Sequence, residues 1–346
     1  MSPRASVHGG SAPGPSLSRV TTAPRHIAVA INPSAAFGAA GHVGPAVVAA
    51  LRAAGHTVDS LCEDSFEQLR EAAAGALDGG APSGGAAEGG ARSGGAAEGG
   101  ARSGCRADVL VVVGGDGMVS LGVGLVAQTG IPLGIVPSGT GNDMARGLGI
   151  PLDDAGAAIA GLVAALDRPP RMIDLGRITR ADGSIRWFAS VFSGGFDAAV
   201  NERANTMRWP RGRSRYTLAI LWQLVRLRAI RYELVLDGVA ETRDAILVAI
   251  ANNESFGGGM RVAPDARLDD GLFDVVTLDP VGRMSLLRIF PRVFAGTHVL
   301  DPRVTVRRAR KVTIRAADVV AYADGERVGS LPVDVEIVPR ALAILH

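Results

Sequence analysis

The sequence predicts an α/β protein with an amino-terminal doubly wound domain and a carboxy-terminal β-rich domain, antiparallel and sandwich-like. Between residues 25 and 168, short apolar runs alternate with segments of helical periodicity, which is typical of a parallel sheet covered by helices. After Pro169-Pro170, strand-like segments follow one another with few helices between them. The length of 346 residues accommodates two such domains.

The first domain is expected to contain four buried strands and five helices. The apolar run at 109–113 is unbroken, as in a strand that is buried on both faces, and Ser65 is suited to cap a helix. The expected strands are 27–31, 57–61, 109–113 and 133–136, and the expected helices are 45–54, 65–77, 119–127, 144–148 and 154–166.

The second domain is expected to consist mainly of strands, and two further segments are expected to stay outside both cores. Residues 1–24 are rich in Ser, Pro and Gly and predict a disordered arm, and residues 79–104 contain a ten-residue repeat starting at Ser83 and Ser93 and predict a flexible insertion. The expected strands of the second domain are 171–178, 187–192, 231–236, 245–251, 273–278, 304–306, 312–314 and 319–322.

The composition narrows the class of protein. With 36 basic and 34 acidic residues the charge is nearly balanced, so no nucleic-acid partner is expected. Lys311 is the only lysine, which excludes a P-loop of the G-x-x-x-x-G-K-[ST] type. Cys62 and Cys105 lack metal-ligand spacing, and the amino terminus lacks the apolar core of a signal peptide. These features favour a cytoplasmic protein that reaches any membrane from outside.

Two glycine-rich turns carry the strongest chemical signal. Gly114-Gly115-Asp116-Gly117 follows the buried strand at 109–113, and Ser138-Gly139-Thr140-Gly141-Asn142 follows the next strand. Parallel strands end at the same sheet edge, where glycines let backbone N–H groups approach phosphate oxygens. Asn32-Pro33 ends the first strand at that edge. The pattern predicts a nucleotide site, and Asp116 among phosphates makes sense only with Mg²⁺ between them.

Seven motifs occur in the order of a known family between residues 26 and 346. They resemble the diacylglycerol kinase and sphingosine kinase family of lipid kinases in its bacterial form. This resemblance implies an ATP-binding first domain, a lipid-binding second domain at 169–328, and a segment at 329–346 that returns to the first domain. The motifs are Asn32-Pro33, Gly114 to Gly117, Pro137 to Asp143, Asn252-Asn253, Gly257 to Gly259, Pro264 to Leu272, and Asp324-Gly325-Glu326.

The resemblance also implies roles for individual residues, with ATP and Mg²⁺ as cofactors. Glu326 is the general base, a role that suits the high pKa of an alcohol acceptor, with Asp324 as the adjacent alternative; Asp116 is the second catalytic residue. A structural magnesium is implied at Asp270 and the carbonyls of Arg267 and Leu272, where a plain turn is the alternative. The implied ATP contacts are Asn32, Pro33, Gly114, Gly115, Asp116, Gly117, Met118, Val119, Ser120, Ser138, Gly139, Thr140 and Asn142.

Met118 departs from the family pattern, because many members have Thr at this position. A methionine cannot donate a hydroxyl to phosphate, and apolar residues also occur here in sphingosine- and ceramide-phosphorylating relatives. The resemblance therefore implies diacylglycerol as substrate and leaves a sphingoid base or ceramide open, with NAD kinase as a more distant alternative that shares the Gly-Gly-Asp-Gly turn.

An arginine-rich segment suggests how the protein meets its lipid. Residues 203–231 contain eight arginines, two tryptophans and no acidic residue. Such a segment suits docking on an anionic bilayer, here the inner face of the plasma membrane, and an ordinary solvated helix is the equally weighted alternative. The expected partners are thus a lipid substrate at a membrane surface and, at most, a second copy of the chain in a homodimer.

Overall fold

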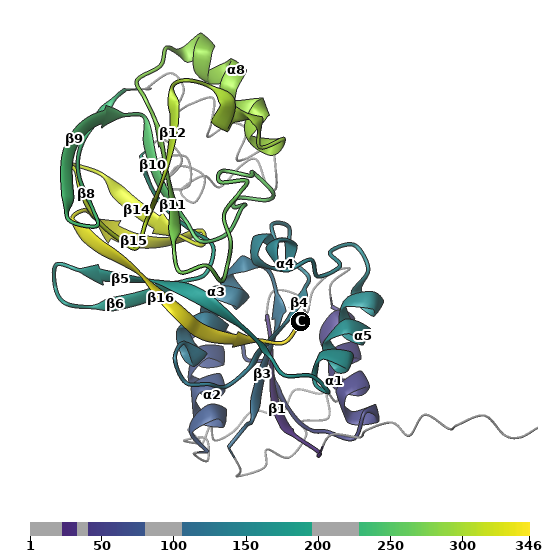
Figure 1. The fold of residues 1–346 in the computed structure, drawn as a ribbon. Helices are drawn as coiled ribbons and strands as arrows, with labels where there is room; N and C mark the ends of the chain where they lie inside the picture. The colour runs from purple at the N-terminus through teal and green to yellow at the C-terminus, as the bar shows by residue number, and fades with distance from the viewer. Residues whose placement is uncertain (1–22, 33–40, 80–105, 196–227) are drawn as a thin grey trace, which may run out of the picture.

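The computed structural model describes residues 23–32, 41–79, 106–195 and 228–346 (Figure 1). Pro33, almost all of the expected arm, nearly the whole 79–104 insertion and the arginine-rich segment up to residue 227 lie outside the described residues.

The amino-terminal part is a parallel sheet with helices on both faces. The strands β1 (His26–Ile31), β2 (Thr57–Leu61), β3 (Val109–Gly114) and β4 (Leu133–Pro137) lie in the order β2-β1-β3-β4. One face is covered by α1 (Val43–Ala53) and α5 (Ala155–Ala165), and the other by α2 (Phe66–Asp78) and α3 (Asp116–Val126). The strand order reverses direction between β1 and β3, so the carboxyl ends of these two strands flank the crevice where ligands bind in such sheets.

The two ends of the predicted insertion lie beside each other. Gly79 caps the carboxyl end of α2 in a left-handed conformation, and the backbone N–H of Ala107 donates to the carbonyl of Ala76 at 2.8 Å. Gly79 and Arg106, the described residues on either side of this segment, therefore lie next to each other near the start of β3.

A long carboxy-terminal strand joins the first sheet to the rest of the molecule. β16 (Val333–Ile344) pairs with β4 in parallel at Ile344 and runs antiparallel to β5 (Arg171–Arg180) and β13 (Lys311–Arg315). Its pairing with β5 shifts between Val338 and Leu342, where Arg340 has a φ of 54°. The expected returning segment is therefore a strand that continues the first sheet into the second half of the chain.

The carboxy-terminal part is an antiparallel sandwich. A six-stranded sheet in the order β12-β11-β10-β7-β14-β15 packs against the far end of the ten-stranded sheet, and Phe188, Phe192, Tyr232 and Phe273 fill the space between them. This arrangement confirms the predicted fold class. The remaining elements are α4 (Asp143–Gly147), β6 (Ile185–Phe188), β7 (Val191–Gly195), β8 (Ile230–Leu236), β9 (Val239–Ala245), β10 (Leu247–Ala251), β11 (Phe273–Leu278), α8 (Arg283–Phe294), the 3-10 helix η2 (Thr297–Leu300), β12 (Val304–Ala309), β14 (Val320–Ala323) and β15 (Glu326–Ser330).

The strands β9 and β15 were not predicted, and two other local predictions were wrong. The single strand expected at 187–192 is two strands, β6 and β7, because the chain crosses between the sheets at Ala189 and Ser190. The helix α8 was not expected, and it contains Pro291, a residue that normally breaks a helix pattern. Its buried side chains, Leu286 and Ile289, pack beside Leu278 of β11, and this tertiary contact supports the helix.

Candidate active site

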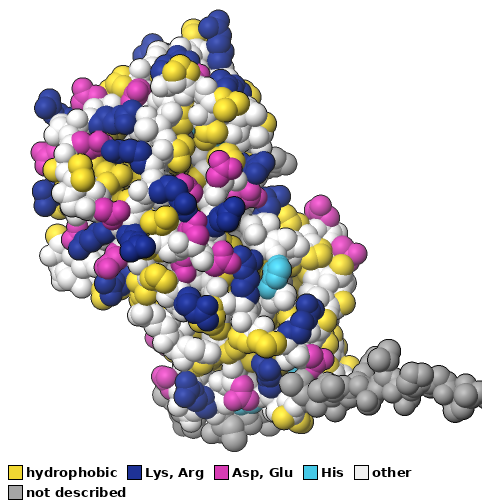
Figure 2. Space-filling view, in the orientation of Figure 1, with side chains coloured by type: hydrophobic (Ala, Val, Ile, Leu, Met, Phe, Trp, Pro, Cys, Tyr) yellow, Lys and Arg dark blue, Asp and Glu magenta, His cyan; other side chains and the backbone are white. Residues whose placement is uncertain are grey.

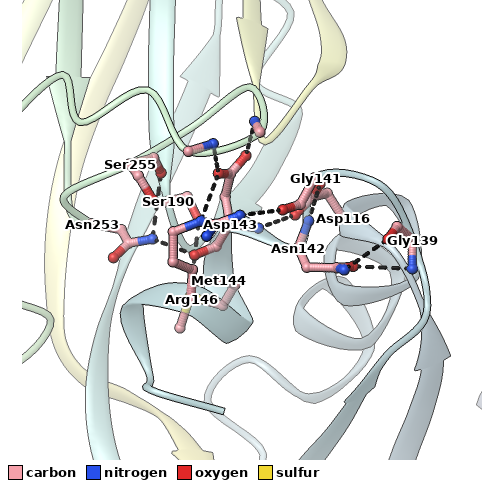
Figure 3. A network of polar contacts seen from close by, with 12 residues as sticks. Asp116, Gly139, Gly141, Asn142, Asp143, Met144, Arg146, Ser190, Asn253 and Ser255 are labelled. Carbon is pink, nitrogen blue, oxygen red and sulfur yellow. Dashed lines mark hydrogen bonds and ion pairs between the residues drawn. The ribbon is translucent and has the colours of Figure 1, made fainter. Parts of the chain in front are cut away.

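The two glycine-rich turns lie against each other at the carboxyl edge of the first sheet, and Figure 3 shows Asp116 of the first turn beside Gly141 and Asn142 of the second. The N–H of Ser138 donates to the carbonyl of Gly114 at 2.9 Å. A Cβ atom on Gly139 would lie 2.4 Å from the Cα of Gly115, and one on Gly141 would lie 2.2 Å from a carboxylate oxygen of Asp116. Glycine is required at 139 and 141 because no side chain fits between the turns.

Asn142 closes the second turn on itself. Asn142 has a φ of 54°, a left-handed conformation that asparagine tolerates better than most residues. The side-chain oxygen accepts the N–H of Gly139 at 3.1 Å, and the side-chain amide donates to the carbonyl of Gly139 at 2.8 Å. Asn142 therefore shapes the turn, and its side-chain amide is engaged within it.

Asp116 ties the first turn to the second. It is the first residue of α3, and its carboxylate accepts the N–H of Asn142 at 3.0 Å and the N–H of Asp143 at 2.7 Å. Burial and, next, the charge of Asp143 raise the pKa of the Asp116 carboxyl, although the N–H donors oppose that shift. Burying the Asp116 carboxylate beside that of Asp143 costs free energy, and a cation bound there would lower that cost.

Asp143 connects this edge to the second half of the chain. Its carboxylate accepts the N–H groups of Gly258 and Gly259, both at 2.8 Å, and its carbonyl accepts the Asn253 side-chain amide at 3.1 Å. The Gly257–Gly259 loop, whose residues all have positive φ, thus lies directly against the second glycine-rich turn. The sequence placed Asp143 in a motif but gave it no role, because its partners lie more than a hundred residues away.

The hairpin of β14 and β15 brings Glu326 to the start of α3. Asp324 and Gly325 have φ values of 50° and 81°, as in the two-residue Asp-Gly turns of tight hairpins. The following residue, Glu326, extends its carboxylate to within 3.6 Å of where a Cβ on Gly117 would lie. Glu326 is exposed, so its carboxylate is available to a substrate.

Asp324 holds the hairpin in place. Its carboxylate accepts the N–H groups of Ala189 at 2.7 Å, Ser190 at 2.8 Å and Val191 at 3.1 Å, where the chain crosses between the sheets. Burial raises the pKa of the Asp324 carboxyl to about 6, the Asp116 charge adds to this, and the three donors oppose it. Since these donors engage both of its oxygens, Asp324 positions its neighbour Glu326.

A buried aspartate that the sequence analysis missed organises the segment behind the site. Asp174 on β5 accepts the N–H of Gly271 at 2.7 Å and the N–H of Arg340 at 2.8 Å. Its carbonyl accepts the Asn252 side-chain amide at 2.9 Å, and that amide also donates to the Ala189 carbonyl. The only available signal was a single acidic residue within a strand-like run.

Most of the other predicted ATP contacts lie at this edge, but two side chains do not face it. Met118 and Val119 are 1% and 5% exposed and belong to the core, and Met118 lies under the first turn against Gly114. Their side chains therefore cannot touch a nucleotide, and the Thr-to-Met departure affects packing under the turn. Asn32 lies beside Gly114, and Ser138, Gly139, Thr140, Gly117 and Ser120 are at least partly accessible.

The start of α3 is suited to bind phosphate. Its N-cap is Gly115, whose lack of a side chain leaves the N–H groups of the first turn without a capping side chain. Uncapped N–H groups and the positive end of the helix dipole favour an anion there. In the described ranges no group of three or more His, Cys, Asp and Glu side chains is arranged to hold a metal. Asp116 is the residue of this edge that would hold an Mg²⁺ ion brought in with a nucleotide, and such an ion would neutralise phosphate charge there.

At the segment where the resemblance implies a structural magnesium, the acidic side chain has a basic partner. The Asp270 carboxylate forms an ion pair with Arg308 and accepts the N–H of Leu272 at 3.2 Å. The Arg308 guanidinium therefore pairs with the carboxylate that the resemblance assigns to the cation together with the carbonyls of Arg267 and Leu272. This magnesium site stays a prediction of the resemblance.

Comparison with known proteins agrees with this architecture. Residues 26–178 match the family model described as the diacylglycerol kinase catalytic domain, and residues 189–346 match the YegS C-terminal NAD kinase beta sandwich-like domain. A diacylglycerol kinase of Mycobacterium tuberculosis is 44% identical over 240 residues, which cover 69% of this chain and 77% of the relative. A diacylglycerol kinase of Bacillus subtilis is 29% identical over 229 residues, covering 65% and 73%.

Solved structures show the same fold. A putative diacylglycerol kinase from Bacillus anthracis superposes with a TM-score of 0.67 at 19% identity, covering 93% of this chain and 97% of that one. Together with the sequence relatives, these matches show that the chain belongs to the diacylglycerol kinase family. It is accordingly an ATP-dependent lipid kinase by class.

Replacing Gly139 by Ala tests the contact between the turns. The new methyl group meets the Gly115 backbone, so the turns must separate and MgATP affinity should fall by about tenfold or more, which is ~1.4 kcal/mol. Gly124→Ala in α3 is the matched control, because nothing lies within 4 Å of its Cβ position and alanine favours a helix. Titration calorimetry of MgATP measures both; equal affinities for the two variants would contradict the packing account.

Asp324→Asn tests the raised pKa through the pH dependence of stability. An acid whose pKa rises from 3.8 to about 6 on folding holds its proton more tightly when folded, so its contribution to the unfolding free energy falls as pH increases between those values. We therefore expect the unfolding free energy of the wild type minus that of Asp324→Asn, both measured by urea unfolding, to decrease from pH 4 to pH 6.5. A difference that increases with pH would mean that the three N–H donors depress the pKa.

Proposed function

We propose that the protein transfers the γ-phosphate of MgATP to the hydroxyl of diacylglycerol and so forms phosphatidic acid. The observation that carries the proposal is the meeting of Asp116, Asp324 and Glu326 beside the start of α3, where two carboxylates from the second half of the chain reach the nucleotide edge of the first. A transfer between a nucleotide and a second substrate needs such a junction.

The glycine-rich turns hold the phosphates. Backbone N–H groups at the start of α3 and along the turn at 138–141 bind phosphate oxygens, and glycines 115 and 139 allow the backbone to come close. When bound, Mg²⁺ neutralises charge on the transferring phosphoryl group. The fixed position of Asp116 aligns the metal nucleotide with the acceptor side of the site.

Glu326 removes the acceptor proton. An alcohol oxygen must lose its proton as it bonds to phosphorus, and an exposed carboxylate at the hairpin end can accept that proton. Asp324 does not compete for this role, because its oxygens are bonded to three backbone N–H groups. It keeps the Glu326 hairpin docked on the strand crossing.

A sphingoid base or ceramide is the alternative acceptor, and NAD is a more distant one. The second half of the chain matches a domain described as NAD kinase beta sandwich-like, which keeps a soluble acceptor in consideration. The curated relatives named diacylglycerol kinase span both halves of the chain and favour the lipid. The buried Met118 side chain no longer bears on this choice, because it does not face the site.

The proposed setting is the cytoplasmic face of the plasma membrane, with the protein bound peripherally to reach its lipid. No helix in the described ranges is long and apolar enough to cross a bilayer. The proposed partners are the lipid surface and, in a homodimer, a second copy of the chain, with no nucleic acid.

Transfer of labelled γ-phosphate to four acceptors tests the function. Diacylglycerol in mixed micelles, sphingosine, ceramide and NAD are offered separately, each with MgATP. Diacylglycerol should be phosphorylated with the highest kcat/KM. A higher value for any other acceptor would replace the proposed substrate.

Glu326→Gln tests the general base. The glutamine keeps the size of the side chain but cannot take a proton, so turnover should fall by about 10²- to 10⁴-fold while the KM for ATP changes little. Glu233→Gln on β8, an exposed glutamate distant in sequence from the hairpin, is the control and should keep wild-type turnover. A loss below tenfold, or one confined to ATP affinity, would remove Glu326 from this role.

A further inference from the structure

The helix α8 exposes an apolar face that the second sheet does not cover. Its inner side chains, Leu286 and Ile289, are buried beside Ile246 and Leu278. On the outer face, Met284 is 65% exposed, Leu287 43% and Phe294 48%, and the following Leu300 is 77% exposed. We define these four residues as the α8 surface.

The charged side chains of α8 are all basic. Arg283 and Arg288 are exposed on the helix, and no acidic residue occurs between positions 280 and 300. The flanking acids are already paired, Asp279 with Arg243 at 2.6 Å and Asp301 with Arg303 at 2.8 Å. Figure 2 shows hydrophobic and basic side chains side by side over the end of the molecule where Figure 1 places α8.

An exposed apolar stripe flanked by arginines is the pattern of a helix that lies in the surface of an anionic bilayer. The apolar side chains enter the boundary between headgroups and acyl chains, and each arginine gains attraction from the anionic lipids. We propose that the α8 surface docks the protein on an anionic membrane. This inference rests on the proposed function, because only a lipid substrate requires the enzyme to settle on a bilayer.

The structure links the α8 surface to the active site through a short stretch of chain. The N–H of Arg261 donates to the carbonyl of Val293 in α8 at 3.0 Å, and the His298 side chain bonds to the carbonyl of Val262 at 3.1 Å. Only Met260 separates Arg261 and Val262 from Gly258 and Gly259, whose N–H groups donate to the Asp143 carboxylate. Docking through α8 therefore holds the loop that borders the nucleotide site close to the lipid surface.

Vesicle sedimentation without ATP or diacylglycerol tests the surface independently of catalysis. The variant Met284→Gln, Leu287→Gln, Phe294→Gln should bind vesicles of phosphatidylcholine and phosphatidylglycerol at least about tenfold more weakly than wild type. Arg283→Gln, Arg288→Gln should bind less tightly and with less salt dependence. Both variants change exposed positions, so their melting temperatures should match wild type.

Matched controls replace exposed residues of the same type elsewhere. Ile185→Gln, Val239→Gln removes two exposed apolar side chains, and Arg310→Gln, Arg315→Gln removes two exposed arginines. These controls should bind vesicles as wild type does. Binding by the α8 variants equal to that of the controls would overturn the proposal, as would a wild-type dimer that becomes a monomer in the triple variant while vesicle binding persists.

The activity readout separates this inference from the proposed function. Phosphorylation of a short-chain, water-dispersed diacylglycerol should be unchanged in the triple variant, whereas phosphorylation of long-chain diacylglycerol in anionic vesicles should fall with binding. If the wild type sediments with vesicles in a way that depends on the α8 surface but phosphorylates no diacylglycerol, the docking proposal is supported and the proposed substrate is refuted. Equal loss on both forms of substrate would refute the docking role of α8.

Discussion

The carboxylate of Asp116 accepts the N–H groups of two successive residues in the neighbouring turn, and this contact fixes the spacing of the nucleotide edge. At that spacing a side chain fits neither at Gly139 nor at Gly141. The same contact directs the backbone into α4, so that the Asp143 carboxylate points to the Gly257–Gly259 loop. One half-buried carboxylate thus sets the geometry of both turns and of their junction with the second half of the chain.

Around the site, separate segments of the chain are joined by aspartate carboxylates that accept backbone N–H groups. Asp143, Asp174 and Asp324 each accept N–H groups from segments distant in sequence. A carboxylate accepts several such bonds strongly, and this offsets part of the cost of burying its charge. The offset is incomplete, since the pKa values of Asp116 and Asp324 remain raised. The residual negative potential is suited to a nucleotide that arrives with Mg²⁺.

The sequence predicted those features that depend on local pattern. The parallel strands and the two glycine-rich turns have signatures within a few residues, and the family order of the motifs placed Glu326 with them. It could not predict features that depend on distant partners. Met118 lies in the core because of its contact with Gly114, α8 forms because its inner face meets β11, and Asp174 and Asp324 acquire roles only when separate segments meet.

The central claim is that Asp116 at the start of α3 and Glu326 at the start of β15 act on a single reaction. A double-mutant cycle with Asp116→Asn, Glu326→Gln and the combined variant, measured as kcat/KM for diacylglycerol phosphorylation, tests this claim most directly. If the two carboxylates serve one transfer, the combined variant should be about as slow as the slower single variant. Losses that multiply would show that the two residues act independently and would contradict the account.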